Sequence, residues 1–421
     1  MPATGRVTHV NVSAGGVPKL PVPEARVGRY GLDGDGHNEP TVHGGPHRAV
    51  CLYSIEAIER LQAEGHPVEP GGVGENLTTA GVEWSLLPVG TRARIGADVL
   101  LELADSTTPC STQRHNFRDG RFSRISIDLH PSDSRMYARV LAEGDVRPGD
   151  EIEILPPAND TRAADELLLA RLDRAVGRSS LAGWRVARRI GQDVRLVEDG
   201  ELVMAAAPRL PGPRWNQALG LARLPNLISE ATDFFDGQQA VGWIVTEASP
   251  RGAAATDTVV AVFAAHPSAI RGDRPPGLEV RELTPSDLPA WAEVGRSGGG
   301  SHRATEEFEA AFDAAVFEVP HAHRFIAMLE GQPVGVASLH VSHHTGWLRG
   351  AMVVPAARGV GIQRALIAAR TARAAELGCD LAGAWAEVGS VSAANMLSLD
   401  FRQVGQREHR RYVPPAVAAA R

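Results

Sequence analysis

Short runs of alternating apolar and polar residues fill the first 155 positions, and this spacing predicts strands. Gly, Pro and Asp clusters separate the runs, as turns require. One helix is predicted at Ser54–Glu64, which starts on a capping serine and ends at Gly65. The predicted strands are Arg6–Val12, Ala49–Leu52, Arg92–Ile95, Val99–Leu103 and Glu151–Leu155. Closely spaced strands with a single helix indicate a barrel-like domain of all-β or α+β type.

From residue 278 onward, strand patterns alternate with helix patterns. The predicted helices begin at Thr284, Thr305 and Ile362, the last running to Leu377. The predicted strands are Leu278–Leu283, Arg324–Glu330, Pro333–His340, Trp347–Val354 and Leu381–Val388. Hairpins between neighbouring strands favour an α/β or α+β domain with a mixed, largely antiparallel sheet.

The middle of the chain carries weaker patterns. Pro156-Pro-Ala-Asn-Asp-Thr reads as a linker into a helix at Ala163–Val176. A hairpin (Val194–Val197 with Leu202–Ala207), a strand near Arg214–Leu221, a helix at Ile228–Phe235 and a strand at Ala240–Thr246 follow. We therefore divide this multidomain chain into residues 1–155, a linker and helix at 156–180, a middle part at 181–277, and a last domain at 278–421.

A glycine loop joins the strand ending at Val354 to the helix that begins at Ile362. The amides of Gly359, Val360, Gly361 and Ile362 are expected to point outward at the positive end of this helix, which suits a pyrophosphate. Arg358 adds a permanent cation. An ordinary strand-to-helix turn is the alternative interpretation of the loop alone.

The loop and the residues after it resemble the GCN5-related N-acetyltransferases (GNAT). The loop Arg358–Arg364 resembles the family's Arg/Gln-x-x-Gly-x-Gly/Ala, with Gln363 in place of the last small residue. Asn395-Met-Leu-Ser resembles its Asn-x-x-Ser/Ala, and Asp400-Phe-Arg-Gln-Val-Gly its closing motif. The resemblance implies acetyl-CoA as cofactor, held by residues 358–364 and Asn395, with Val353 and Val354 offering main-chain groups to the pantetheine arm. Residues 181–277 look like the degenerate accessory half of a tandem acetyltransferase.

Acetyl transfer needs a base and a proton for the leaving thiolate. The candidate bases are Glu387, near its strand end, and His340; His343 and His344 are further candidates, of which at least one is expected in a solvated turn. Many relatives have a Tyr acid after the Asn, but the stretch after Asn395 contains no Tyr before Tyr412.

Three polar motifs stand out in the first domain. They are Gly31–His37 followed by His43–Arg48, Gly74–Gly81, and Pro109-Cys110 ahead of Arg114 and His115. Together with Lys19 they resemble the MOSC family, named for the C-terminal part of molybdenum-cofactor sulfurases. The resemblance implies sulfur carriage, molybdenum or pyridoxal phosphate binding, and a site built from Lys19, Asp35, His43, Arg48, Glu75, Asn76, Cys110 and Arg114.

The residues themselves leave alternatives open. His37, His43, His47 and Asp35 could bind a metal, but Gly-Gly-Pro between two of the histidines excludes a helical pair, so turn-forming and anion-facing roles are favoured. The Cys110 thiolate could carry sulfur or ligate molybdenum, or Cys110 could be a small buried hydrophobe. Asn76 and Thr78 could simply hold their own turn.

Composition narrows the setting. A formal net charge of −7 over 421 residues gives no sign of nucleic-acid or membrane-surface binding. No apolar run has the length of a membrane span, and the N-terminus lacks a signal-peptide pattern. Three cysteines favour a reducing cytoplasm. The expected partners are a small-molecule or protein amine and a sulfur donor such as a cysteine desulfurase, and a homodimer is compatible with the sequence.

Two hypotheses follow. The first is a fusion protein in which an N-acetyltransferase is joined to a MOSC domain that carries sulfur or binds molybdenum cofactor. The second is a non-catalytic carrier, in which the GNAT domain binds CoA or acts structurally. The missing Tyr and the presence of Gln363 motivate the second hypothesis.

Overall fold

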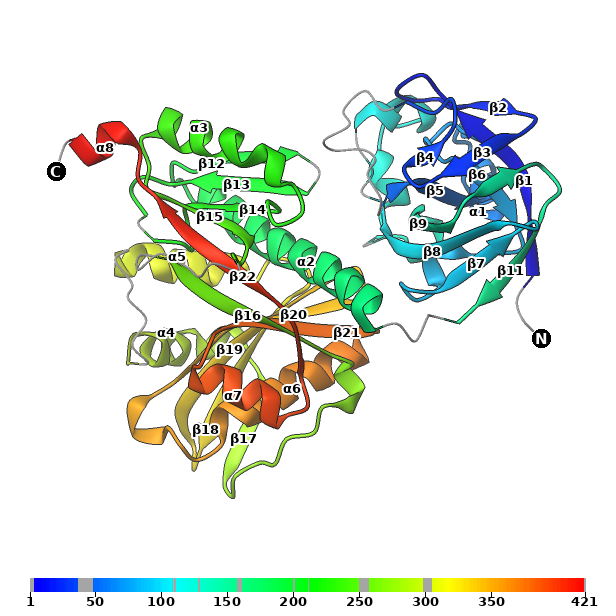
Figure 1. Ribbon diagram of the computed structural model, residues 1–421. Coiled ribbons are helices and arrows are strands. Elements are labelled where there is room, and N and C mark those ends of the chain that lie inside the picture. Colours follow the sequence, from blue (N-terminus) through cyan, green and yellow to red (C-terminus); the bar gives the residue numbers. More distant parts are fainter. Residues whose placement is uncertain are drawn as a thin grey trace. The chain divides into compact units, whose positions relative to one another are not determined.

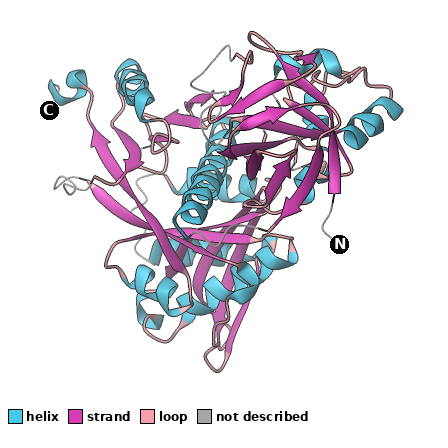
Figure 2. Ribbon diagram, turned by 45° about the vertical axis from the view of Figure 1, so that its right-hand side comes forward, coloured by secondary structure: helices cyan, strands magenta, loops and turns pink. Residues whose placement is uncertain are grey.

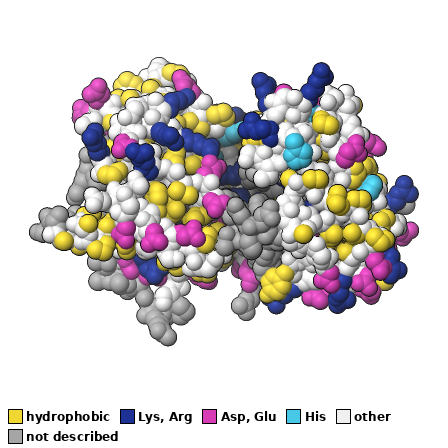
Figure 3. All heavy atoms as spheres, turned by 90° about the horizontal axis from the view of Figure 1, so that it is seen from above, with side chains coloured by type: hydrophobic (Ala, Val, Ile, Leu, Met, Phe, Trp, Pro, Cys, Tyr) yellow, Lys and Arg dark blue, Asp and Glu magenta, His cyan; other side chains and the backbone are white. Residues whose placement is uncertain are grey.

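The computed structural model describes residues 4–36, 48–107, 109, 111–127, 129–156, 161–199, 201–210, 212–249, 257–297 and 305–419, with only the backbone for 161–164. The chain forms two compact units, Met1–Leu167 and Leu168–Arg421. Both units contain strands and helices, as Figure 2 shows. No described helix has the length and apolarity needed to span a membrane. Acidic, basic and apolar side chains are intermixed on the face shown in Figure 3.

The first unit is a barrel. Its described strands follow the order β11-β7-β8-β9-β5-β6-β1-β2, and a β1–β11 pairing closes the sheet. The main strands are β1 (Thr4–Val12), β5 (Val50–Ser54), β6 (Leu77–Ala80), β7 (Arg92–Ile95), β8 (Val99–Ser106), β9 (Met136–Ala142) and β11 (Glu151–Leu155), with β2 (Leu20–Val22) at the edge. A smaller sheet joins β3 (Ala25–Gly28), β4 (Gly31–Leu32) and β10 (Gly144–Val146). The β5–β6 pair is parallel, so the barrel is mixed. The barrel-like prediction is confirmed.

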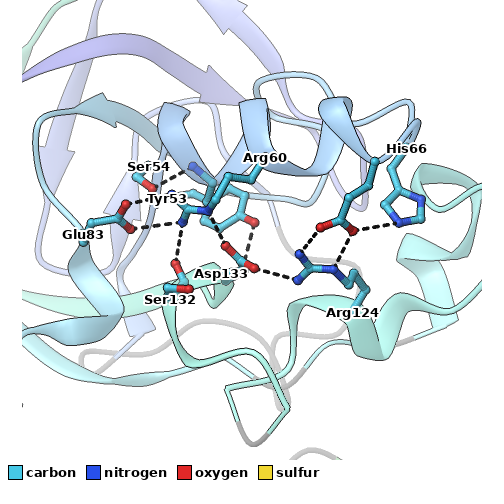
Figure 4. Close-up of polar contacts among 10 residues, drawn as sticks. Tyr53, Ser54, Arg60, His66, Glu83, Arg124, Ser132 and Asp133 are labelled. Atoms are coloured by element: carbon cyan, nitrogen blue, oxygen red, sulfur yellow. Dashed lines mark hydrogen bonds and ion pairs between the residues drawn. The ribbon is translucent and has the colours of Figure 1, made fainter.

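Helix α1 (Ile55–Ala63) begins at the predicted cap, since the Ser54 side chain accepts from the Ala57 N–H at 3.2 Å. Short 3-10 turns lie at Trp84–Leu86, Ser111–Asn116, Phe122–Ile125 and Pro131–Asp133. Figure 4 shows the polar network that ties α1 to two of them. Asp133 accepts from Arg60 Nε at 2.8 Å and from Arg124 Nη1 at 2.6 Å. The network therefore anchors the chain after the third polar motif.

The second unit contains an 11-stranded sheet among the described residues, in the order β12-β13-β14-β15-β22-β16-β21-β20-β19-β18-β17. Its first strands are β12 (Arg195–Asp199), β13 (Leu202–Ala206), β14 (Gln217–Leu219) and β15 (Gly242–Glu247). The others are β16 (Thr258–Ala265), β17 (Leu278–Glu282), β18 (Ala322–Leu329), β19 (Gln332–Ser342), β20 (Thr345–Val353), β21 (Leu381–Glu387) and β22 (Arg402–Tyr412). Strand β22 lies between β15 and β16 (Figure 1), so strands before and after residue 278 share one sheet.

Helices cover both faces of this sheet. Alternate residues of one strand point to opposite faces, so Phe325 packs in the core that includes α6 (Ile362–Glu376), while Ile326 packs with Val294 of α4 (Leu288–Ser297). The remaining helices are α2 (Thr161–Arg189), α3 (Ile228–Gln238), α5 (Glu306–Val316), α7 (Val391–Ser398) and α8 (Pro415–Ala419). Short 3-10 turns lie at Pro225–Leu227, Pro267–Ala269, Pro285–Asp287 and Pro355–Ala357.

Helix α2 packs tightly against the sheet. A Cβ at Gly383 would lie 2.2 Å from a methyl carbon of Leu172, so only glycine fits there. The Arg407 guanidinium binds the Asp173 carboxylate through two hydrogen bonds of 2.9 and 2.6 Å. The helix runs to Arg189, well beyond the predicted end at Val176, because its apolar side chains are buried by the sheet.

Candidate functional site

The loop before α6 presents free main chain. Gly361 is the N-cap residue of the helix, with φ of 91°, and Gly359 has φ of 83°, both in the left-handed region that favours glycine. A Cβ at Gly359 would meet no atom within 4 Å. Residues 358–360 are exposed, and the first amides of a helix have no intrahelical acceptor. Gly359, Val360, Gly361 and Ile362 therefore form an exposed N-terminal helix mouth that suits an anion.

The Gln363 side chain does not fill this mouth. Its Nε2 donates to Ser392 Oγ at 3.1 Å, and its Oε1 accepts from Asn395 Nδ2 at 2.7 Å. Gln363 thus ties α6 to α7, and Asn395 is engaged in that link. Arg364 is exposed in the first turn of α6.

Strands β20 and β21 separate beside the loop. They pair in parallel only over Thr345–Trp347 with Leu381–Gly383, although every residue of both strands is described. The Val354 N–H donates to Val334 O of β19 at 3.0 Å. Successive residues of an antiparallel strand direct their N–H and C=O groups alternately to opposite sides, so the N–H and C=O of Val353 face away from β19, toward the open edge. Arg358 Nε donates to Val353 O at 3.2 Å. Val353 therefore suits the role expected for it, whereas the amide of Val354 is already used.

A bulge in β20 is held by a buried arginine. The pairing shifts between Ala337 and Ser338, which leaves Gly350 as an extra residue with φ of 51°. Arg370 of α6 donates from Nη1 to Ser338 O at 3.1 Å and to Gly350 O at 3.4 Å. Burial lowers the pKa of Arg370 to about 9. This cation supports the strand that borders the open edge.

A pocket of about 690 Å³ lies on the α4 side of these strands. Its wall includes His340 of β19 and Arg349 to Met352 of β20, with side chains from α2, α4 and α5. His340 therefore lies where a base could meet an acceptor. Glu387 does not line this pocket and is exposed at the end of β21. His343 and His344 form the β19–β20 turn, with φ of 48° and 56°. Tyr412, the first Tyr after Asn395, donates its hydroxyl to Asp236 at 2.8 Å.

The first unit brings four of its predicted site residues together. The Lys19 ammonium pairs with the buried Asp35 carboxylate, and Asn76 Nδ2 donates to Asp35 Oδ2 at 2.9 Å. Glu75 is fully buried and accepts from the Gly71 N–H at 2.7 Å and from Thr78 Oγ1 at 3.0 Å. Burial raises the pKa of the Glu75 carboxyl. We call Lys19, Asp35, Glu75 and Asn76 the barrel polar cluster.

The other predicted residues of this site either contact aromatic rings or lie outside the described residues. The Arg48 guanidinium carbon lies 5.5 Å from the Tyr137 ring centre, and that of Arg114 lies 5.7 Å from the Phe122 ring centre. His43 and Cys110 lie outside the described residues. Cys51 is buried, and its pKa is raised to about 11 mainly by burial.

Comparison with known proteins gives both units a family. Residues 39–153 match the MOSC domain, and residues 287–401 match the acetyltransferase (GNAT) family. The chain joins a MOSC domain to a GNAT domain. Both resemblances seen in the sequence are thereby confirmed.

The chain is also similar to individual proteins. It is 27% identical over 184 residues to the uncharacterized protein YflK of Bacillus subtilis, covering 41% of this chain and 82% of YflK. It is 34% identical over 152 residues to YiiM of Escherichia coli, covering 35% of this chain and 66% of YiiM. A GCN5-related N-acetyltransferase structure from Sphaerobacter thermophilus aligns with 16% identity over 60% of this chain and 94% of that protein, with a TM-score of 0.40.

Several residues of these domains had no clear signal in the sequence. In the MOSC domain, Arg135 Nη1 donates to Val73 O, beside the barrel polar cluster. In the second unit, Arg214, Arg349 and Arg370 look like ordinary surface arginines in the sequence. Only the pairing of distant strands and helices brings them to the pocket or beneath the bulge.

Proposed function

We propose that the GNAT domain transfers the acetyl group of acetyl-CoA to the amine of a small molecule or protein. The observation that carries the proposal is the exposed helix mouth at Gly359–Ile362 beside the open edge of β20. The diphosphate of CoA would bind the amides of the mouth, and the pantetheine arm would bind the Val353 main chain. The thioester then points toward the pocket that contains His340.

In the reaction, His340 takes a proton from the acceptor ammonium, and the neutral nitrogen attacks the acetyl carbon. The carbon–nitrogen bond forms and the carbon–sulfur bond breaks. The second nitrogen proton leaves to water, which gives the neutral amide, and the CoA thiolate receives a proton from water. Water is proposed because the Tyr412 hydroxyl is bound to Asp236, away from the pocket residues. Glu387 remains the second candidate base.

Thiol release from acetyl-CoA with a panel of amines tests this function. We expect turnover in the wild-type chain, and a loss of CoA affinity of roughly tenfold or more in Arg358→Glu, because a cation beside the diphosphate is replaced by an anion. Absence of both CoA binding and turnover in the wild-type chain would leave the non-catalytic carrier as the better hypothesis.

For the MOSC domain, we propose that Cys110 carries a sulfur atom delivered by a donor such as a cysteine desulfurase. The supporting observation is a set of buried polar atoms with no hydrogen-bond partner among the described residues: Glu75 Oε2, Gln113 Oε1 and Arg135 Nε. Such atoms are costly unless a ligand or water satisfies them. The described residues contain no group of three His, Cys, Asp or Glu that could hold a metal ion.

Mass spectrometry of the intact chain after incubation with a desulfurase and cysteine tests sulfur carriage. One added sulfur atom in the wild type, absent in Cys110→Ala and retained in Cys51→Ala, is expected. Metal analysis of the same sample tests molybdenum binding. A sulfur atom that persists in Cys110→Ala would assign the carrier role to another residue.

A further inference from the structure

Arginine side chains are concentrated in the pocket of the second unit. The arginines that line it are Arg214, Arg296, Arg324 and Arg349, and the carboxylates are Glu306, Glu309 and Asp313. Arg324 is satisfied by Asp313, because its Nη2 donates to Asp313 Oδ1 at 2.9 Å and its Nη1 to Asp313 O at 2.9 Å. This pair therefore neutralises itself.

Arg214 is only loosely paired. Its guanidinium carbon lies 4.7 Å from the Trp215 ring centre and 4.8 Å from that of Phe312, so the two rings hold the group in place. Its Nη1 is 3.8 Å from Glu309 Oε2, which is too long for a hydrogen bond. The Arg214 side chain is 39% exposed. Its fork of N–H donors thus keeps capacity for another acceptor.

Arg349 has no carboxylate partner among the described residues. Its Nη1 donates to Ser179 Oγ of α2 at 3.3 Å, and this is a neutral, long hydrogen bond. Burial, with a smaller contribution from the charge of Arg214, lowers the pKa of Arg349 to about 10. Arg349 is partly buried in the pocket wall, and a cation there without a counter-ion is stabilised when an anion pairs with it.

The strand register places Arg349 near the candidate base. Ser338 lies opposite Arg349, and His340 lies opposite Trp347. His340 and Arg349 are thus diagonal neighbours on one face of the β19–β20 pair, roughly 7–8 Å apart at the backbone. A single small molecule can reach both side chains.

We propose that the acceptor is an amine that also carries an anionic group, and that Arg349 and Arg214 bind this group while His340 faces the amine. The inference rests on the proposed acetyltransferase function. The guanidinium fork matches the oxygens of a carboxylate or a phosphonate, which share this chemistry. The aromatic walls formed by Trp215, Trp291 and Phe312 suit an apolar body between the two groups.

The test uses the full chain, acetyl-CoA and two matched sets of amines. The first set is phenylalanine, its phosphonate analogue, phenylalaninamide and phenethylamine; the second is β-alanine and propylamine. We expect kcat/KM to be at least roughly tenfold higher for the anionic amines of each set than for their neutral analogues. Comparison of phenylalanine with its phosphonate analogue shows which anion is preferred. Arg349→Met should lower kcat/KM by roughly 10- to 100-fold for anionic amines and by a much smaller factor for neutral amines.

Arg195→Met is the matched control, because that side chain is 65% exposed on β12 and lies outside the pocket. If Arg349→Met fails to fold, the kcat/KM values of Arg214→Met, and of the wild type with anionic and neutral amines, still test the anion site. Equal kcat/KM for anionic and neutral members of both sets would overturn the inference while leaving the acetyltransferase function intact.

A binding measurement distinguishes failure of the anion site from failure of the proposed acetyl transfer. N-acetylphenylalanine should raise the Tm of the wild-type chain more than N-acetylphenethylamine does, and Arg349→Met should remove this difference. If no amine is acetylated but the difference in Tm is present, the anion site stands and the proposed reaction fails. Equal Tm shifts with no turnover would overturn both.

Discussion

An alanine at Gly359 tests the proposed diphosphate site with an internal control. Gly359 precedes α6 with φ of 83°, and Gly378 follows α6 with φ of 78°. A Cβ at either position would meet no protein atom within 4 Å. The two substitutions therefore impose the same backbone strain at opposite ends of one helix, and neither creates a clash.

The expected stability effects are equal. An L-residue held in the left-handed region costs about 1–2 kcal/mol, so both variants should lose that amount of unfolding free energy in urea. The expected binding effects differ. If the diphosphate packs against the loop main chain, the Cβ of Gly359→Ala displaces it, and a loss of about 1.4 kcal/mol corresponds to a tenfold higher Kd for CoA.

Isothermal titration of acetyl-CoA into both variants measures this difference. We expect Gly378→Ala to bind as the wild type does, since it lies at the far end of the helix. Equal Kd values for Gly359→Ala and Gly378→Ala would refute the assignment of the loop, whatever the stability of the two proteins.

Three further predictions concern the packing. Burial near Trp385 lowers the pKa of His409 to about 4, so between pH 4 and about 6.5 the unfolded chain binds the proton more readily than the folded chain does. The free energy of unfolding of the second unit should therefore fall by up to about 3 kcal/mol as pH falls through this range. His409→Phe should remove this pH dependence in urea titrations at several pH values. Asp133→Ala should cost about 2–3 kcal/mol in urea because it leaves Arg60 and Arg124 without their shared carboxylate (Figure 4). Gly383→Ala should lower Tm by several degrees, because its Cβ would lie 2.2 Å from Leu172.

Each prediction has a control or a contradicting result. If wild type and His409→Phe lose unfolding free energy in parallel below pH 6.5, a group other than His409 causes the pH dependence and the prediction is wrong. Glu153→Ala breaks an ion pair whose members are 54% and 50% exposed, and should cost under about 1 kcal/mol. An unchanged Tm for Gly383→Ala would show that α2 is packed less closely than described.

Local signals in the sequence predicted the elements that depend on local chemistry. The Ser54 and Thr305 caps, the turn at Gly361 and the helix at Ile362 lie where capping residues and apolar spacing indicated. The strand β16 was missed, because no neighbouring part of the chain indicates a partner strand for its run of apolar residues. Its partners β21 and β22 lie more than a hundred residues away in the chain.

The candidate sites also differ in whether local sequence signals or long-range pairing determine them. Glycine positions predicted the helix mouth, because it depends on neighbouring residues. The members of the barrel polar cluster are far apart in the sequence, and only the resemblance to the MOSC family predicted them as one site. The acceptor pocket combines Ser179, Arg214, His340 and Arg349 from four separate elements. No spacing along the chain links such residues, because the sheet order that unites them depends on long-range pairing.

The most direct test of this account is a crystal structure of the chain with CoA. We predict that diphosphate oxygens lie within hydrogen-bonding distance of the Gly359–Ile362 amides, with the pantetheine arm along the open edge of β20. A diphosphate bound elsewhere, or a helix mouth filled by the Arg364 side chain, would contradict the account.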